Sequence, residues 1–230
     1  MAKAVPAPRR RVAGMDLVGL CRAVDEEFAV TGVDTPPWPD PHPGGEVRDE
    51  EYSRCLEPAK YLVLAARAEA WTRALSRLGL AEVETVADPA AIWRRAPDVG
   101  VSDAVRLHPV RAHAVPLVFG FSAIDKVPRT VLVVGAGEPA VSLEQLPDCG
   151  CDACDSGSAD LLDVVDEVVA AVVTGTFVHV DAGQGREIVC TGDGWSASNW
   201  DASGPPVEEA LAAARAGRSP FRVVRGTAWE

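Results

Sequence analysis

Three of the six cysteines in this chain lie within one short stretch, at Cys149, Cys151 and Cys154. Thiolates bind soft metals, and Zn²⁺ in proteins is usually held by four nitrogen or sulfur ligands at about 2.0–2.3 Å. Three aspartates surround these thiols, namely Asp148, Asp152 and Asp155. Negative neighbours disfavour a free thiolate, and a bound cation would reverse that penalty. The stretch 149–154 therefore favours a structural metal knuckle, with zinc as the expected ion.

The cluster supplies three ligands, so a fourth must come from elsewhere. We expect His179 in that role, with Cys190, a nearby aspartate or a water as alternatives. His179 shares one face of a predicted strand with Phe177 and Asp181, which also fits a hydrogen-bonded structural histidine. The sequence has no second Cys-x-x-Cys pair, so the site is not a standard zinc ribbon.

Two other interpretations of the cysteines stay open. Cys151 and Cys154 have the spacing of a redox pair and could form a disulfide, but redox thiolates usually lie at a helix N-terminus beside positive charge. Here the neighbours are acidic, and the next predicted helix begins only at Ser158. The remaining interpretation is a polar turn whose thiols bind nothing. No serine lies in a nucleophile-elbow context, so the sequence identifies no catalytic residue.

A glycine-rich segment resembles a dinucleotide-binding fingerprint. Gly135 and Gly137 follow an apolar run in the pattern G-x-G-x-x-A. That fingerprint requires a long helix directly afterwards, and an acidic residue about 20 residues further on. Instead, residues 140–146 are few, alternate like a strand and stop at Pro147. We therefore predict a hairpin turn over 135–139 and no cofactor-binding residues.

Composition restricts the class of protein. The chain has 230 residues, 47% of them hydrophobic and 24% charged, and a net charge of −12. This acidity argues against nucleic acid or an anionic membrane as the main partner. No apolar run approaches the roughly 18 residues of a membrane span, and no signal peptide is evident. We expect a soluble cytoplasmic protein, where thiols stay reduced and Cys21 and Cys55 are core residues.

The pattern of apolar residues and of glycine and proline predicts an α+β fold. It combines N-terminal helices, a mostly antiparallel sheet, a helix after the cysteine cluster and a C-terminal helix. We expect a disordered basic tail over 1–13 and one domain over 14–230. Helices are predicted at 16–29, from 59 to 78, at 91–95, 158–174 and 206–216, and strands at 104–110, 115–121, 130–134, 140–146, 177–181 and 187–191. A proline-rich loop over 35–45 has Trp38 as its expected anchor.

Several segments together resemble an uncharacterised domain-of-unknown-function family of actinobacteria. They are Glu50-Glu51-Tyr52-Ser53-Arg54, Pro58-Ala59-Lys60-Tyr61, the run C-G-C-D-A-C-D-S-G-S from Cys149, Phe177-Val178-His179-Val180 and Gly194-Trp195-Ser196-Ala197. The resemblance covers roughly residues 40–229, and the cysteine run is its most specific part. It implies an actinobacterial, cytosolic, single-domain protein. It implies no activity and no catalytic residues.

These observations favour a non-enzymatic binding protein with an unidentified protein partner, in which a metal knuckle fixes a loop. The alternative is an enzyme that depends either on a thiolate-bound metal with an open coordination position or on a thiol. His179 or an aspartate would be the base in the metal-dependent case. A third reading is a metal-free binding module that uses the loop of Trp195 and Trp200. Neither the partner nor the oligomeric state follows from the sequence.

Overall fold

The computed structural model describes residues 16–192, 194–200 and 204–230. The predicted disordered tail at 1–13 lies outside these residues. Within them, four α-helices accompany two antiparallel sheets, so the predicted α+β class is confirmed. The helices are α1 (Leu17–Thr31), α2 (Leu62–Arg77), α3 (Ser158–Val173) and α4 (Val207–Arg215). Short 3₁₀ helices lie at Asp49–Ser53 (η1), Pro58–Tyr61 (η2) and Asp152–Cys154 (η3).

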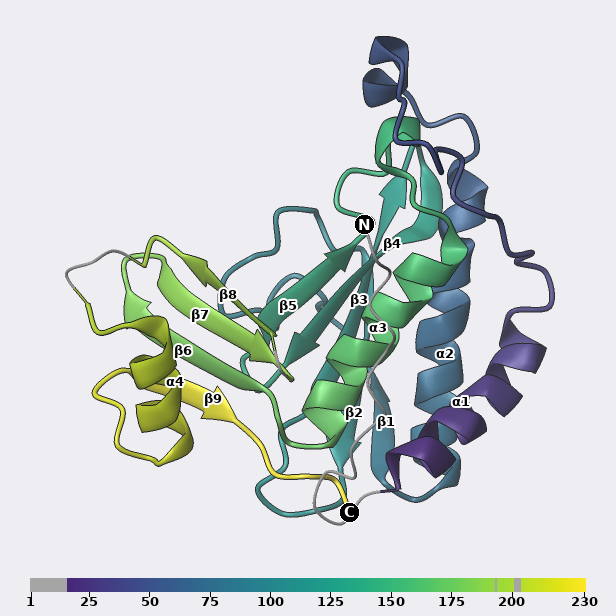
Figure 1. Cartoon of the computed structure of the whole chain (residues 1–230). Helices are drawn as coiled ribbons and strands as arrows, with labels where there is room; N and C mark the ends of the chain where they lie inside the picture. The colour runs from purple at the N-terminus through teal and green to yellow at the C-terminus, as the bar shows by residue number, and fades with distance from the viewer. Residues whose placement is uncertain (1–15, 193, 201–203) are drawn as a thin grey trace.

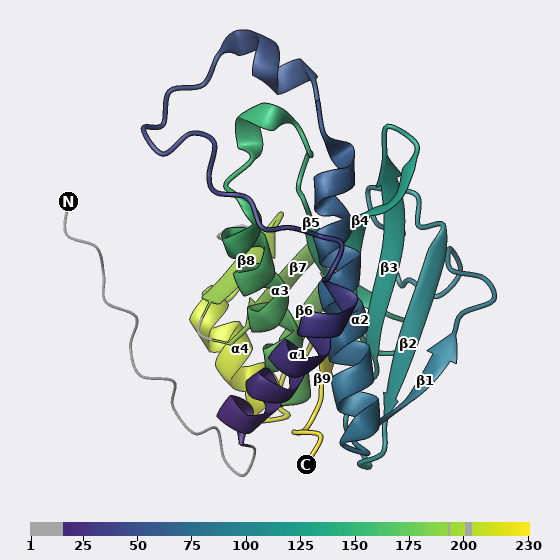
Figure 2. The ribbon, with the colours of Figure 1, turned by 90° about the vertical axis from the view of Figure 1, so that its right-hand side faces the viewer.

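The larger sheet is a five-stranded antiparallel meander in which each strand pairs with the next along the chain. Its strands are β1 (Ala81–Thr85), β2 (Asp103–Pro109), β3 (Leu117–Ile124), β4 (Val127–Ala136) and β5 (Val141–Leu146). Figures 1 and 2 show α1, α2 and α3 together on one face of this sheet. The main core lies between these helices and the sheet, and it extends from Leu20 in α1 to Trp229 near the C-terminus. The expected single domain over 14–230 stays a prediction.

The spacing of valines explains how α3 packs. Val165, Val168, Val169 and Val172 recur at helical spacing and are all buried. A polar contact joins the same helix to α2. Asp166 accepts hydrogen bonds from Arg67 Nη2 at 2.6 Å and from Trp71 Nε1 at 2.7 Å. The apolar stripe thus covers the sheet, and the ion pair fixes the register of the two helices.

The opposite face of the larger sheet explains the glycines of the apparent dinucleotide fingerprint. β4 and β5 form a hairpin, as predicted, instead of the strand and helix that such a motif requires. Trp93 packs on this face, and a Cβ atom at Gly135 would lie 2.5 Å from its ring. Gly120 has the same role, with 2.8 Å to the ring. Trp93 forms a single bridge to Ala140 and does not lie in the helix predicted at 91–95.

The smaller sheet has the strand order β8-β7-β6-β9. Its strands are β6 (Val178–Gly183), β7 (Arg186–Thr191), β8 (Gly194–Ser198) and β9 (Arg222–Arg225). The predicted hairpin of β6 and β7 is confirmed, and α4 covers one face of this sheet (Figure 1). No helix in the described ranges is both long and apolar enough to cross a membrane.

Candidate metal centre

The three clustered cysteines lie in the turn that joins β5 to α3. Gly150 has φ +69°, and a Cβ atom there would approach Ile124 Cδ1 to 2.6 Å, so this position requires glycine. η3 follows, and Gly157, with φ +88°, leads into α3. The turn therefore packs closely on the β3–β4 hairpin, and the short 3₁₀ helix carries the last thiol.

This turn brings the three thiols together. The Sγ atoms of Cys149 and Cys151 are 3.1 Å apart, and all three Sγ atoms, including that of Cys154, lie within 4.8 Å of one another. Tetrahedral zinc with bonds of about 2.3 Å to sulfur separates its thiolates by about 3.8 Å. The donor set and its spacing therefore fit a thiolate-bound metal after small adjustments. Cys149 and Cys154 are exposed, so the side away from the protein is open.

The thiols share their protons unequally. Burial alone would raise the pKa of Cys151, but hydrogen bonds from Cys149 and Cys154 outweigh it and lower that pKa below its usual value. The hydrogen bonds to Cys149 and Cys151 raise the pKa of Cys154 to about 12. Cys151 is thus disposed to ionise while Cys154 holds its proton, and a bound metal cation would release that proton.

Asp155 anchors the turn to the proline-rich loop instead of pointing at the thiols. Its carboxylate accepts hydrogen bonds from Lys60 Nζ at 2.5 Å, from Trp38 Nε1 at 2.9 Å and from the Gly157 amide at 2.9 Å. Burial would raise the pKa of Asp155, but the Lys60 and Trp38 hydrogen bonds outweigh it and lower the pKa. Trp38 also packs edge-on against Tyr61 at 5.9 Å between ring centroids, so it is the anchor predicted for its loop.

Asp152 makes a second attachment in the same direction. Its carboxylate accepts from Arg54 Nε at 3.1 Å and from the Leu56 amide at 3.1 Å, and its own amide donates to the Arg54 carbonyl at 2.9 Å. The turn around η3 and the segment around η1 therefore lie side by side, as both ribbon views show (Figures 1 and 2). Two aspartates of the cysteine run thus hold the turn in place.

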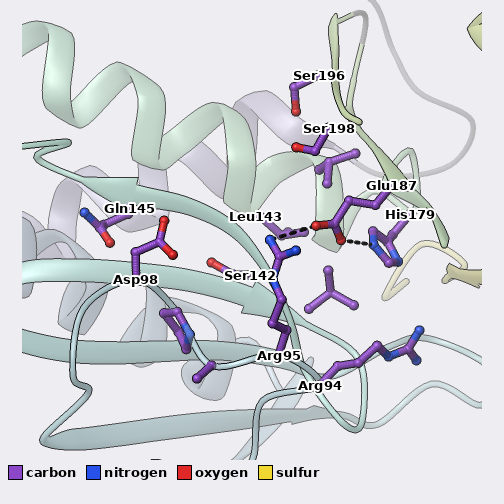
Figure 3. A pocket seen from close by; sticks show the side chains of 14 residues that line it. Arg94, Arg95, Asp98, Ser142, Leu143, Gln145, His179, Glu187, Ser196 and Ser198 are labelled. Atoms are coloured by element: carbon purple, nitrogen blue, oxygen red, sulfur yellow. Dashed lines mark hydrogen bonds and ion pairs between the residues drawn. The ribbon is translucent and has the colours of Figure 1, made fainter. Parts of the chain in front are cut away.

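The other expected ligands lie in the smaller sheet. His179 is on β6 and its Nε2 is 3.1 Å from Glu187 Oε2, and it is not a member of the group of thiols within 4.8 Å (Figure 3). Cys190 is buried on β7, where Arg215 Nη2 lies 3.1 Å from its Sγ. Neither side chain belongs to the cysteine group that the structure assembles from its described residues.

Sequence reasoning did not identify Lys60 as part of the site. It lies next to Trp38 and Tyr61, with its Nζ 5.7 Å and 5.1 Å from the two ring centroids, and it is paired with Asp155. Its rarity is a signal, since the chain has only two other lysines, Lys3 and Lys126. The chain otherwise uses arginine, so a lysine in an aromatic surrounding marks a site that needs a compact point charge.

The fold and the site define a mixed α+β protein with a three-cysteine turn that can hold a metal ion. A model of a family of unknown function (DUF6226) matches residues 24–230, and the chain belongs to that family. Neither the curated proteins nor the solved structures gave a match to the chain.

Proposed function

We propose that Cys149, Cys151 and Cys154 bind one zinc ion with a structural role, and that the protein acts by binding a protein partner. The observation that supports this proposal is the convergence of three thiols within 4.8 Å in a turn built by positive-φ glycines. Zinc suits three thiolates because it tolerates tetrahedral sulfur coordination without redox chemistry. Asp152 and Asp155 are already paired with cations, so they leave the thiolate charge for a metal to balance.

The fourth ligand is proposed to come from the open side of the turn. His179 lies on β6 of the smaller sheet and outside the group of converging thiols, which makes it a less favourable fourth ligand than expected from the sequence. Cys149 and Cys154 are exposed, so a nitrogen or sulfur side chain of a protein partner can complete the coordination. Tyr52 and Leu56, in the adjoining segment, are 62% and 69% exposed, and they supply apolar surface for such a partner.

The test is metal content together with stability. Protein purified without chelator should contain about one zinc per chain by mass spectrometry, and the triple Cys149→Ser, Cys151→Ser, Cys154→Ser variant should contain none. The control is Cys21→Ser, which removes a thiol from α1 and should keep the metal. Equal zinc in the triple variant and the wild type would refute the site. A wild type without metal and with a Cys151–Cys154 disulfide would instead support the redox pair.

One observation favours a second function, a metal- or thiol-dependent enzyme. Two of the three thiols are exposed, and a catalytic zinc keeps a position open for water or substrate. The two proposals differ in the coordination of the bound metal. X-ray absorption that shows four sulfur or nitrogen ligands and no water supports the structural role, whereas three sulfurs and an exchangeable oxygen support the enzyme.

The setting of this function is proposed to be the cytoplasm of an actinobacterium, with the C-G-C-D-A-C-D-S-G-S run as the family signature. The support is the chain's formal charge of −12 and its six cysteines, none of which forms a disulfide; these suit a reducing compartment and no nucleic-acid or membrane partner. Redox titration of the thiols at a cytosolic glutathione potential would test this setting, and oxidation there would contradict it.

A further inference from the structure

The smaller sheet has two faces of opposite character. Val178, Val180, Ile188 and Cys190 point to one side and pack against α4. The strand alternation places a different set on the other side, because residues paired across strands share a face. This second set consists mostly of polar residues, namely His179, Asp181, Glu187, Val189, Ser196 and Ser198.

That polar face is turned toward the larger sheet. It meets β5 and the loop 94–98, and the three together line a cavity of about 220 Å³ that is open to solvent (Figure 3). Facing sheets normally bury apolar side chains between them. A junction lined by charged groups and hydroxyls does little for packing, so its residues point to binding.

His179 forms the deepest part of this polar face. The side chain is 1% exposed, and burial lowers its pKa despite the neighbouring Glu187, so the ring is neutral near pH 7. Its Nε2–H then donates to Glu187 Oε2, and its buried Nδ1 has no hydrogen-bond partner among the described residues. A buried polar ring that is only half satisfied lowers stability, which is a reason to assign it a role in fixing Glu187.

Glu187 in turn positions Arg95. Arg95 Nη2 lies 2.8 Å from Glu187 Oε1, so the carboxylate is engaged on both oxygens. A guanidinium has five N–H donors, and this contact leaves most of those of Arg95 available at the cavity. The side chain of Arg95 is 70% exposed, so solvent and solutes can reach it. The row of His179, Glu187 and Arg95 therefore presents an oriented cation to the cavity (Figure 3).

An anion faces the same cavity from the same loop. Asp98 lines it and, within the described part of the chain, its carboxylate has no ion-pair or hydrogen-bond partner. Ser142 lies between Asp98 and Arg95, and Ser198 lies above Glu187 (Figure 3). The cavity thus offers a free carboxylate, a partly free guanidinium and hydroxyl groups that can donate or accept.

We propose that this cavity binds a small zwitterion of the free amino acid class, with its carboxylate on Arg95 and its ammonium group on Asp98. Opposite charges at two positions of one small cavity match a ligand that carries both charges, whereas a simple anion would leave Asp98 unpaired and repelled. The size agrees, because a cavity of about 220 Å³ has room for several water molecules or a small organic molecule in their place. The cavity excludes the three clustered cysteines, so the proposal is independent of zinc.

The experiment is nuclear magnetic resonance of the full chain, with a mixture of the twenty L-amino acids at millimolar concentration followed by each alone. Saturable shifts should appear at the backbone amides of Ser142, Glu187 and Ser198. The variants Arg95→Gln and Asp98→Asn should each weaken binding about tenfold or more, since each removes a charged hydrogen bond. Both side chains are exposed, so folding should be retained. Arg111→Gln, an exposed arginine outside the cavity, is the control and should bind normally.

Inorganic phosphate and L-malate are the comparison ligands, because they carry negative charge without an ammonium group. Binding of an amino acid that is lost in both cavity variants and kept in Arg111→Gln supports the proposal. Absence of saturable shifts with all twenty amino acids overturns it. Binding of malate or phosphate that is unaffected by Asp98→Asn, with no amino acid bound, overturns it as well. The triple cysteine variant should bind the amino acid as the wild type does, so this result is separate from the metal test.

Discussion

Replacement of Asp155 by alanine is the sharpest test of how the cysteine turn is held. Asp155 is 7% exposed and accepts from three donors, the Lys60 ammonium, the Trp38 indole and the Gly157 amide. Hydrogen bonds to a charged group contribute about 1.5–3 kcal/mol each, and breaking a buried ion pair from one side costs about 3–5 kcal/mol. Lys60 keeps 17% of its side chain exposed and can regain water, so we expect the lower end, a loss of about 3 kcal/mol.

The assay is urea unfolding at pH 7, followed by fluorescence and by circular dichroism. A loss of about 3 kcal/mol is smaller than the 5–15 kcal/mol stability of ordinary proteins, so the variant should still fold. It is nevertheless a large part of that stability, so the urea midpoint should fall clearly. Asp155→Asn keeps an acceptor for Trp38 but loses the charge that Lys60 needs, and it should lie between the alanine variant and the wild type. The matched control is Asp148→Ala, an exposed aspartate of the same turn, with an expected change within about 0.5 kcal/mol.

The difference in stability between the wild type and Asp155→Ala should depend on pH, and the direction follows from the pKa of Asp155. The pKa of Asp155 is lowered in the folded protein, so its contribution is present above the unfolded value of about 3.9 and is lost as pH falls through the folded pKa. The gap between wild type and Asp155→Ala should therefore close in acid and be constant above about pH 5. If Asp155→Ala unfolds at the same urea concentration as Asp148→Ala at pH 7, the anchoring role is refuted.

Three further predictions follow from other positions. Burial lowers the pKa of His179, so the unfolded chain gains a proton at a higher pH than the folded protein does, as pH falls below about 6.5. Urea midpoints measured from pH 7.5 to 5 should therefore fall, and they should fall less steeply in His179→Gln. Gly157→Ala should lower stability by about 1–3 kcal/mol or more in thermal unfolding, because φ is +88° and its Cβ would lie 2.6 Å from the Asp40 amide nitrogen, whereas Gly44→Ala, which meets nothing, should not. Trp229→Ala should lower the free energy of unfolding by about 3–5 kcal/mol in urea, because the indole is 2% exposed in the core. Unchanged unfolding midpoints in any of the three experiments would contradict the packing described.

Strong periodicity decided which elements the sequence could predict. The helix at 158–174 has valines at helical spacing, and α3 begins and ends within a residue of it. β1 and β8 were absent from the predicted set because four or more of their five residues are exposed, so neither has the alternation of a half-buried strand. β9 is four residues long and pairs with β6 across more than thirty residues of chain, which no local pattern reports. The division into two sheets was not predicted for the same reason.

The same difference between local and long-range features applies to the candidate site. The convergence of Cys149, Cys151 and Cys154 is local, so spacing alone predicted it. The partners that hold the turn lie about 95 to 120 residues away in the sequence, as the bonds of Asp155 to Lys60 and of Ser158 to Trp38 show. No pattern within one sequence relates those distant segments.

The two tryptophans of the loop around 195–200 differ in their surroundings. Trp195 is 48% exposed, whereas Trp200 packs edge-on against Phe221.

The geometry of η3 explains why cysteines and aspartates alternate in the motif. A 3₁₀ helix has three residues per turn, so residues three apart lie on the same side. Cys151 and Cys154 therefore share one side of the turn, and Asp152 and Asp155 share another. The aspartates bind Arg54 and Lys60 on the protein side, while the thiols gather on the other. One short run thus both anchors the turn and gathers the thiols, and replacing an aspartate should loosen the turn without removing a thiol.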